Sequence, residues 1–319
     1  MALRRSIGVL LPRDLPASQV LDYARTVELA GFDELWVVED LGFRGGFSQS
    51  AAVLTATEHL SVGIGILPAA ARNIAFCAME VSTLAQLFPG RIQLGVGHGM
   101  PGWMRQAGCW PDRPLTYLSE YAHALRTLLV GRRVDGLVAG WQVDDLQLAP
   151  SCVPAVMPPL LLGVRGPRSL AASGRIADGT VLAEPCAPEY VRAALRDIAP
   201  RGEHRVVAYN VAAVDEDPEA AVRTARTGLE WIGEPDWAPH LAPLPFAAEL
   251  AAARAAATSR EQFAAALPSE WVQQLALAGT RDQVRARMDE LFVAGVTSTV
   301  FIPIGADPMV AVRALATVL

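Results

Sequence analysis

The chain has 319 residues, of which 52% are hydrophobic, enough for the large closed core that a single barrel domain of this length can bury. Its net charge of −6 argues against a nucleic-acid surface, because phosphate binding needs a concentrated basic face. All 27 basic residues are arginine, which excludes a Schiff-base lysine and a P-loop lysine.

Short apolar strands alternate with longer amphipathic helices along the chain, the pattern of parallel βαβ units. The predicted strands are Ser6–Leu11, Glu34–Val38, Leu60–Leu67, Arg91–Val96, Pro159–Gly163, Gly179–Ala183, Val206–Val214 and Thr297–Pro303. The predicted helices are Ser18–Ala30, Gln49–Thr57, Ile74–Phe88, Pro114–Val130, Arg168–Gly174, Ala187–Ile198 and Arg281–Ala294, with a last helix after the eighth strand.

Two segments interrupt this alternation. Residues 131–158 contain several glycines and prolines, and we interpret them as an insertion with a small hairpin. Residues 218–277 hold several alanine-rich helical pieces separated by prolines, too long for a plain crossover. We expect this second insertion to help cover one end of the fold.

Eight strands, each followed by helical sequence, predict an α/β fold: a single (β/α)8 TIM barrel over residues 1–319. Continuous apolar strands such as VGIGIL suit a fully covered parallel sheet. The competing interpretation is an open doubly wound sheet, which a glycine-rich turn after the first strand would favour. That turn reads PRDLP here, so we favour the barrel.

The functional site of a barrel lies where its strands end, so residues just after each strand are the candidates. Glu39 and Asp40 follow the second strand and could position a cofactor ring or a substrate, although a helix cap or a solvated loop remains an alternative. Gly97, His98 and Gly99 follow the fourth strand. Glycines there allow close approach of a ligand or a neighbouring backbone, and an imidazole can bond a cofactor carbonyl or transfer a proton.

A phosphate site is predicted after the fifth and sixth strands. Gly163, Arg165 and Gly166 precede a helix whose N-terminal N–H groups suit an anion, and Arg165 or Arg168 could add charge-assisted bonds. A plain tight turn is the alternative interpretation. The sixth strand, DGTVLAEP, ends beside this position in a barrel and supports the phosphate site.

Other side chains give weaker signals. Trp103 and Trp110 lie in a long loop after the fourth strand and could wall a pocket. The five histidines show no metal-ligand spacing, so we predict no metal.

The four cysteines, Cys77, Cys109, Cys152 and Cys186, form no CxxC pair and no disulfide framework. The N-terminus is a poor signal peptide, and no apolar stretch approaches the length of about 20 residues that crosses a bilayer. We therefore expect a soluble cytoplasmic protein that does not bind a membrane.

Over nearly its whole length the chain resembles the bacterial luciferase-like monooxygenase superfamily, and most of all its branch of coenzyme F420-dependent reductases. The segments that carry the resemblance are AGFDELWVVED, VGIGILPAAARNIAFCAMEVSTLAQLFPGRIQLGVGHG, PPLLLGVRGPRSLAASGRIADGTVLAEP and AGTRDQVRARMDELFVAGV. The resemblance implies a homodimer of barrels that each hold a flavin or deazaflavin at the C-terminal mouth.

The resemblance also implies roles for particular residues. Asp40 and the end of the third strand, Ile66 and Leu67, would hold the ring, and a bulge with a non-prolyl cis peptide would fall within Gly63–Ile66. The Gly97-His98-Gly99 turn would lie along the cofactor. Backbone groups at Arg165-Gly166 and at Ala183-Glu184 would take its phosphate, although the family often has a hydroxyl residue at the position of Glu184.

Two positions depart from the sugar-phosphate dehydrogenases of this branch. Those enzymes have a histidine after the aspartate and a glutamate after the second glycine of the strand-four turn, where this chain has Leu41 and Met100. The acid and base for alcohol oxidation are missing, and Leu41, Met100 and Trp103 are instead expected to line a substrate pocket.

Three hypotheses follow. The first is a reductase that passes a hydride from reduced F420 to an activated C=C or C=N bond of a small organic molecule, with His98, Glu39 or water as proton donor. The second is a monooxygenase that uses reduced FMN and O2 in the same cavity. The third is a barrel that has lost catalysis and carries the cofactor.

Overall fold

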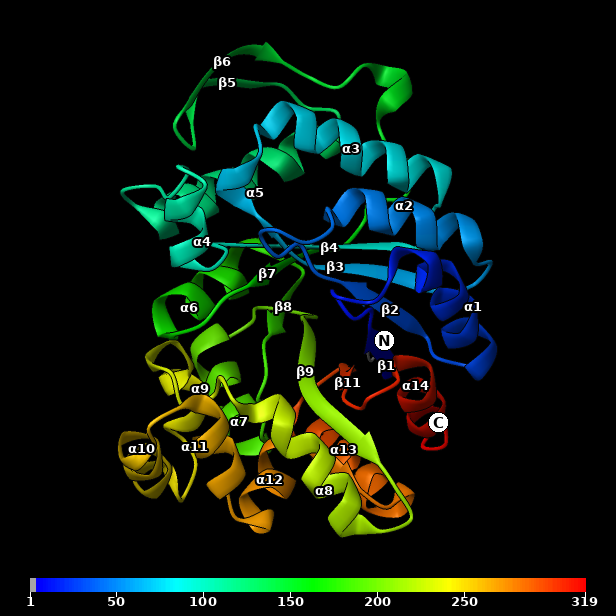
Figure 1. Ribbon diagram of the computed structural model, residues 1–319. Helices are drawn as coiled ribbons and strands as arrows, with labels where there is room; N and C mark the ends of the chain where they lie inside the picture. Colours follow the sequence, from blue (N-terminus) through cyan, green and yellow to red (C-terminus); the bar gives the residue numbers. More distant parts are fainter. Residues whose placement is uncertain (1–3) are drawn as a thin grey trace.

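Eight parallel strands close into a barrel in the computed structural model of the chain, which describes residues 4–319 (Figure 1). The barrel strands are β1 (Ser6–Leu10), β2 (Glu34–Val37), β3 (Ser61–Pro68), β4 (Ile92–Gly97), β7 (Leu160–Gly163), β8 (Gly179–Leu182), β9 (Arg205–Val214) and β11 (Ser298–Pro303). The pairing of β8 with β9, with Leu182 opposite Ala208, closes the ring. The barrel prediction is therefore confirmed, and every predicted strand end lies within one residue of the observed one.

Helices surround the barrel and cover the outward-facing side chains of its strands. They are α1 (Val20–Ala30), α2 (Gly46–Ala56), α3 (Ile74–Leu87), α5 (Pro114–Leu129), α6 (Pro167–Ile176), α7 (Pro188–Ile198), α13 (Arg281–Ala294) and α14 (Pro308–Ala316). Because successive side chains of a strand point to opposite faces, Leu35 and Val37 of β2 pack against these helices while Trp36 between them fills the barrel. None of the helices within residues 4–319 is both long and apolar enough to cross a membrane.

In the barrel interior, a large side chain packs directly against a glycine of the neighbouring strand. Trp36 is fully buried, and a Cβ on Gly63 of the neighbouring strand would lie 2.3 Å from its ring. Glycine is therefore required at position 63 because the indole occupies the space where a side chain would point.

A buried polar group lies at the N-terminal end of the barrel. The Glu34 carboxylate accepts hydrogen bonds from Trp36 Nε1 and Ser298 Oγ, both at 2.7 Å, and forms an ion pair with Arg205 of β9. These bonds satisfy a carboxylate that would otherwise be costly to bury.

The segments outside the barrel differ in part from prediction. The hairpin in residues 131–158 is present as β5 (Val134–Val138) and β6 (Trp141–Leu146). The long insertion contains α8 (Pro218–Arg226), α9 (Ala238–Leu241), α10 (Ala247–Ala256), α11 (Arg260–Ala266) and α12 (Ser269–Leu275).

Among the strands and α-helices of residues 4–319, two were not predicted. One is β10 (Leu277–Gly279), which extends the sheet beside the end of β9, and the other is α4 (Pro101–Gln106), within the expected loop after β4.

Candidate functional site

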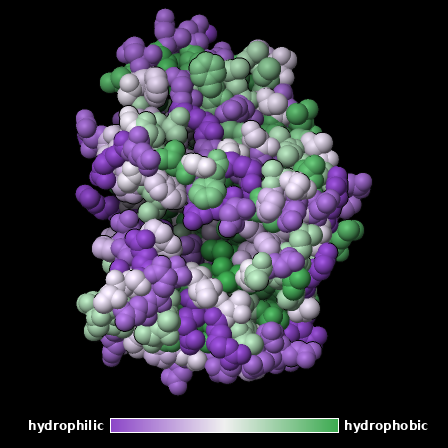
Figure 2. All heavy atoms as spheres, viewed as in Figure 1, coloured by the Kyte–Doolittle hydropathy of each residue, from purple (hydrophilic) through white to green (hydrophobic). Residues whose placement is uncertain are grey.

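The predicted site residues follow five strands that are consecutive neighbours in the sheet, β2, β3, β4, β7 and β8. Because parallel strands end on the same side, their C-terminal ends form one arc of the barrel mouth. On the face seen in Figure 2, apolar residues lie at the bottom of a recess near the middle of the molecule, with mostly polar residues around it. The structure therefore gathers the candidates at one mouth.

A bulge at the end of β3 forms part of the floor of this mouth. The pairing of β3 with β4 shifts register between Ile64 and Leu67, and the peptide bond between Gly65 and Ile66 is cis. This bulge lies within Gly63–Ile66, where the family resemblance placed it. The Leu67 side chain is buried in the core between barrel and helices, so Leu67 can offer only its backbone to a ligand at the mouth.

The glycines of β4 and β7 make room for the bulge. A Cβ on Gly163 would lie 2.3 Å from Ile66 Cγ2, and a Cβ on Gly97 would lie 2.9 Å from Ile66 Cδ1 and 2.5 Å from the Gly163 carbonyl. The half-buried Ile66 side chain is thus seated over two glycines. Close approach of a neighbouring segment, rather than of a ligand, therefore explains why Gly97 and Gly163 are glycines.

Tyr209 reaches the underside of the bulge from β9, on the opposite side of the barrel. A Cβ on Gly65 would lie 2.1 Å from the Tyr209 hydroxyl, and the phenol ring packs edge-on against Trp36 with centroids 5.8 Å apart. The hydroxyl is buried and has no hydrogen-bond partner within residues 4–319. Burial, together with the nearby carboxylates of Glu34, Glu184 and Asp40, raises the pKa of Tyr209, so its proton stays in place. An orphaned donor at this position fits a site that receives a polar ligand.

Asp40 is fixed by a cation from the first loop of the barrel. Arg13, after β1, donates from Nη1 to Asp40 Oδ2 at 2.6 Å, and its guanidinium lies 4.8 Å from the Phe43 ring centroid. The carboxylate keeps 23% of its surface exposed at the mouth. Asp40 can therefore hold a ligand group while Arg13 orients it.

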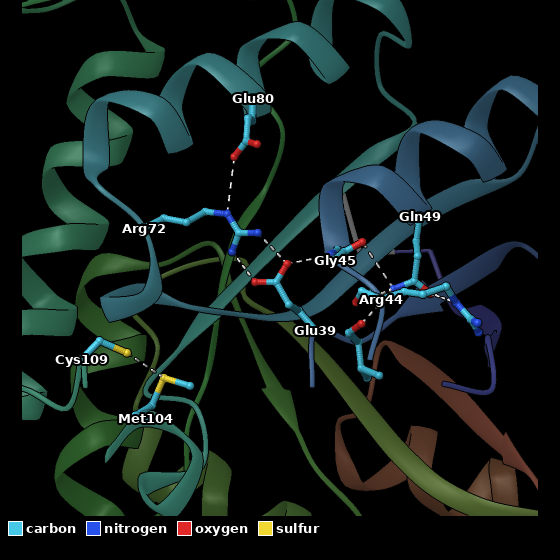
Figure 3. Close-up of polar contacts among 10 residues, drawn as sticks. Glu39, Arg44, Gly45, Gln49, Arg72, Glu80, Met104 and Cys109 are labelled. Carbon is cyan, nitrogen blue, oxygen red and sulfur yellow. Dashed lines mark hydrogen bonds and ion pairs between the residues drawn. The ribbon is translucent and has the colours of Figure 1, made fainter. Parts of the chain in front are cut away.

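Glu39 is bound on both oxygens (Figure 3). Arg72 makes a two-pronged ion pair with it, with Nη2 to Oε2 at 2.7 Å, and the Gly46 amide donates to Oε2 at 2.7 Å. Arg72 also lies 3.5 Å from Glu80 Oε2 of α3. The Gly46 contact explains why α2 begins three residues earlier than predicted, because Glu39 satisfies an amide at its first turn. This geometry suits a positioning residue, and the role of Glu39 as proton donor stays a prediction.

The loop between β2 and α2 has a second set of bonds. Arg44 donates to the Leu15 and Pro12 carbonyls at 2.8 and 3.2 Å, and Gln49 donates to the Val38 carbonyl at 3.1 Å. Arg44 and Gln49 lie side by side in Figure 3, where Arg44 Nε is 3.4 Å from Gln49 Oε1. These contacts join the loops after β1 and β2, which carry Arg13 and Asp40. The sequence offered no local signal for them, since Arg44 lies 29 positions from Leu15.

His98 leads from β4 into the short helix α4. Its ring is half-buried, and burial lowers its pKa, so the imidazole is neutral at pH 7. Met104 of α4 packs beneath Gly99, and its sulfur lies 3.7 Å from Cys109 Sγ (Figure 3). Among the predicted pocket residues, Leu41 is 40% exposed, Trp103 is half-buried, and Met100 packs against the cluster formed by the long insertion.

The predicted phosphate site lies at the start of α6. Gly166 precedes the helix with φ of 74°, and Pro167 occupies the first turn, so the free N–H groups point out of the helix end. Arg165 donates from Nη1 to the Asp236 carbonyl at 3.3 Å and lies over the Trp237 ring at 4.5 Å. The long insertion therefore reaches this loop, and Arg165 is the link.

Glu184 follows β8 and is half-buried, with Ala183 beside it. Burial raises the pKa of Glu184. A hydrogen bond to its own backbone and the charges of Arg165 and Arg13 oppose this shift, and the charge of Asp40 adds to it. His240 of α9 lies behind the same loop, stacked on Tyr190 at 4.2 Å, and burial together with the Arg165 charge lowers its pKa to about 3. The mouth thus contains a carboxyl group whose pKa is raised above its ordinary value, chiefly by burial.

The comparisons with known proteins agree with this fold. The model of the luciferase-like monooxygenase family matches residues 6–298. The chain is 27% identical over 320 residues to 5,10-methylenetetrahydromethanopterin reductase of Methanolobus tindarius, with 95% of each chain covered. It is 31% identical over 193 residues to the F420-dependent glucose-6-phosphate dehydrogenase of Beutenbergia cavernae, covering 57% of this chain and 55% of that one.

A solved structure has the same architecture. The coenzyme F420-dependent tetrahydromethanopterin reductase from Methanopyrus kandleri superposes with a TM-score of 0.83 and 20% identity, covering 98% of this chain and 97% of that one. This superposition shows the shared fold. Because the family model matches residues 6–298, the chain belongs to the luciferase-like monooxygenase family.

Proposed function

We propose that this protein is an oxidoreductase that uses reduced coenzyme F420 to transfer a hydride to an activated C=C or C=N bond of a small organic substrate. The observation that carries the proposal is the arrangement at the mouth, where Asp40, the Gly65–Ile66 bulge, the Gly97–Gly99 turn and the start of α6 end neighbouring strands. Relatives that match along the whole chain or over more than half of it are named as F420-dependent enzymes or as reductases.

The residues at the mouth fit such a cofactor. The bulge offers the half-buried Ile66 above Gly97 and Gly163, and the Tyr209 hydroxyl beside Gly65 has no hydrogen-bond partner among residues 4–319; Asp40 offers a carboxylate at the rim. Arg165 and the N–H groups at Gly166 and the following turn suit the phosphate, with backbone groups of Ala183 and Glu184 beside them. When bound, the deazaflavin supplies the hydride, and the protein positions the reactants and excludes water.

The substrate pocket favours reduction of an apolar molecule over oxidation of a sugar phosphate. Leu41 and Met100 occupy the two positions where the family's sugar-phosphate dehydrogenases have an acid and a base, and the chain has no lysine to bind a second phosphate. Leu41, Met100 and the half-buried Trp103 instead offer apolar contacts.

Cofactor binding tests the proposal directly. Purified protein should quench the fluorescence of oxidised F420 with saturable affinity, and Asp40→Asn and Arg165→Ala should each weaken that affinity. Unchanged affinity in both variants would show that the site is elsewhere. Reduction of an electrophilic alkene by reduced F420 would exclude a non-catalytic carrier.

The family's description favours a second candidate, a monooxygenase that uses reduced FMN and O2. FMN shares the ring and the phosphate, so the same residues could hold it. Tight F420 binding without FMN binding excludes this candidate, and the reverse result excludes the reductase.

We further propose that the protein is a homodimer that uses the outer face of α3. Phe76, Met79 and Leu87 on this helix leave 64%, 54% and 65% of their surfaces exposed, an unusual concentration of large apolar side chains. Light scattering should show a dimer, and Phe76→Arg with Met79→Arg should give a monomer. Monomeric wild-type protein would contradict the proposal.

We also place the protein in the cytoplasm, because all four of its cysteines are free. Cell fractionation tests this placement, and recovery in an exported fraction would contradict it.

A further inference from the structure

Hydride addition to a neutral double bond also requires a proton, and the carboxylates at the rim are mostly engaged. Both oxygens of Glu39 are bound by Arg72 and the Gly46 amide. Asp40 is paired with Arg13 at 2.6 Å. Oxygens of both carboxylates are therefore occupied by partners within the protein.

The other titratable groups near the mouth are no better placed. His98 is neutral at pH 7, because burial lowers its pKa. His240 is 1% exposed and stacked on Tyr190, with its pKa lowered to about 3, so it carries no acidic proton. Tyr209 holds its proton tightly, because burial raises its pKa.

Glu184 differs from all of these. It stands directly after β8, in the same arc as the bulge and the start of α6, and its carboxyl makes no ion pair or hydrogen bond to another side chain within residues 4–319. We propose that Glu184 is the catalytic acid of this enzyme, which donates its proton to the substrate atom next to the carbon that receives the hydride. This proposal rests on the proposed function.

The step balances without a further reagent. A bound reduced deazaflavin would supply the hydride, with its two electrons, to one atom of the C=C or C=N bond. The π electrons of that bond then form the new bond to the Glu184 proton at the other atom. The Glu184 carboxylate that remains is reprotonated from water, and the two electrons would come from oxidation of the deazaflavin.

The charges around Glu184 come from every side of the mouth. A hydrogen bond to its own backbone, together with Arg165 after β7 and Arg13 after β1, opposes protonation, while Asp40 after β2 favours it. Cys186, two residues further along the chain, and Tyr209 of β9 also lie within electrostatic range but stay neutral, because burial raises both of their pKa values. Burial is the largest effect on Glu184 and raises its pKa. A carboxyl group with a raised pKa keeps its proton to a higher pH and can act as an acid closer to neutrality.

Two substrates and three variants test the assignment in the F420-loaded enzyme. Cyclohexenone is a neutral alkene whose reduction needs a proton, and an N-alkyl iminium cation accepts a hydride without one. Glu184→Gln removes the proton and keeps the shape, and Glu184→Asp keeps a carboxyl set back by one methylene. Glu216→Gln is the control, because Glu216 is an exposed acid just after β9 on the same side of the barrel.

In Glu184→Gln, cyclohexenone turnover should fall by roughly 10²–10⁴-fold, the usual contribution of a positioned acid. Iminium reduction and the dissociation constant for oxidised F420 should each stay within about threefold of wild type. Wild-type kcat for cyclohexenone should decrease as pH rises through the pKa of Glu184, and this decrease should be absent in Glu184→Gln. Glu216→Gln should behave as wild type.

Three results would overturn the assignment. One is a Glu184→Gln enzyme that reduces cyclohexenone within threefold of wild type. Another is a parallel loss of F420 affinity and of both reductions, which would make Glu184 a binding residue. The third result is a Glu184→Asp enzyme whose kcat for cyclohexenone no longer depends on pH. This variant should keep the pH dependence of wild type at a rate about tenfold lower. It provides the test if the Glu184→Gln variant does not fold. Failure of the proposed function itself would appear in the wild type, as no F420 binding and no hydride transfer to either substrate.

Discussion

Replacement of Gly163 by alanine should disturb the floor of the site through one steric contact. The new Cβ would lie 2.3 Å from Ile66 Cγ2, closer than any real carbon contact, and Cγ2 is attached to a branched Cβ that cannot rotate away freely. Overpacking of this kind costs about 1–3 kcal/mol. Urea unfolding of Gly163→Ala should show this loss, and F420 affinity should decrease because the bulge must move.

A double-mutant cycle identifies the cause. Ile66→Ala removes the clashing methyl, so the two substitutions together should destabilise the protein by less than the sum of the single effects, with a coupling of about 1 kcal/mol or more. Gly102→Ala is the matched control, because no atom lies within 4 Å of its Cβ position in α4, and it should change stability by less than about 1 kcal/mol. Additive effects, or a Gly163→Ala protein with wild-type stability and affinity, would refute the role assigned to this glycine.

Three further outcomes are expected. Tyr209→Phe should leave the free energy of unfolding unchanged or slightly higher, because it removes a buried hydroxyl that has no hydrogen-bond partner in the part of the chain that the structure describes, yet F420 should bind about 2–10-fold more weakly; a loss of stability above about 1 kcal/mol would reveal a protein partner. Glu39→Gln should cost about 1–3 kcal/mol in urea unfolding, because it leaves Arg72 and the Gly46 amide poorly paired, whereas Asp22→Asn in the exposed pair with Arg25 should cost less than about 0.5 kcal/mol; equal costs would contradict the role of burial. Because the pKa of Glu184 is raised, the folded state holds this proton more tightly than the unfolded state, and wild-type stability falls as pH rises from the ordinary carboxyl range toward the raised pKa. Glu184→Gln should therefore be more stable than wild type at pH 7 but not at pH 4. A stability difference that does not change with pH would show that the Glu184 carboxyl titrates normally.

The closed barrel could be predicted because its signals are local. Each strand is a short apolar run, and each helix after it has apolar residues at helical spacing, so the strand boundaries were correct to within one residue. The elements that were missed carry weak local signals: β10 has three residues, and α4 is a six-residue helix in a glycine-rich segment. Strand β10 exists because it can pair with the end of β9, which the sequence around Leu277 does not reveal.

At the site, too, features with a local sequence signal could be predicted and features that depend on distant residues could not. Its residues could be located, because strand ends are recognisable and barrels place their sites there. Their partners could not, since Arg13 pairs with Asp40 across 27 positions and Arg72 with Glu39 across 33. Tyr209 was missed for a related reason: a tyrosine inside an apolar strand is usually a packing residue, and only the closed barrel brings its hydroxyl beneath Gly65.

The guanidinium of Arg165 has two candidate binding partners, the long insertion and the phosphate of the proposed cofactor. In the structure it lies on the Trp237 ring and holds a carbonyl of the insertion 71 positions away. A phosphate that recruits it must first compete with this contact, worth about 0.5–1 kcal/mol, so the apparent dissociation constant for the phosphate rises by about 2–5-fold. If the proposed phosphate site draws Arg165 away, the indole of Trp237 loses its neighbouring cation, and its fluorescence should change as the phosphate binds.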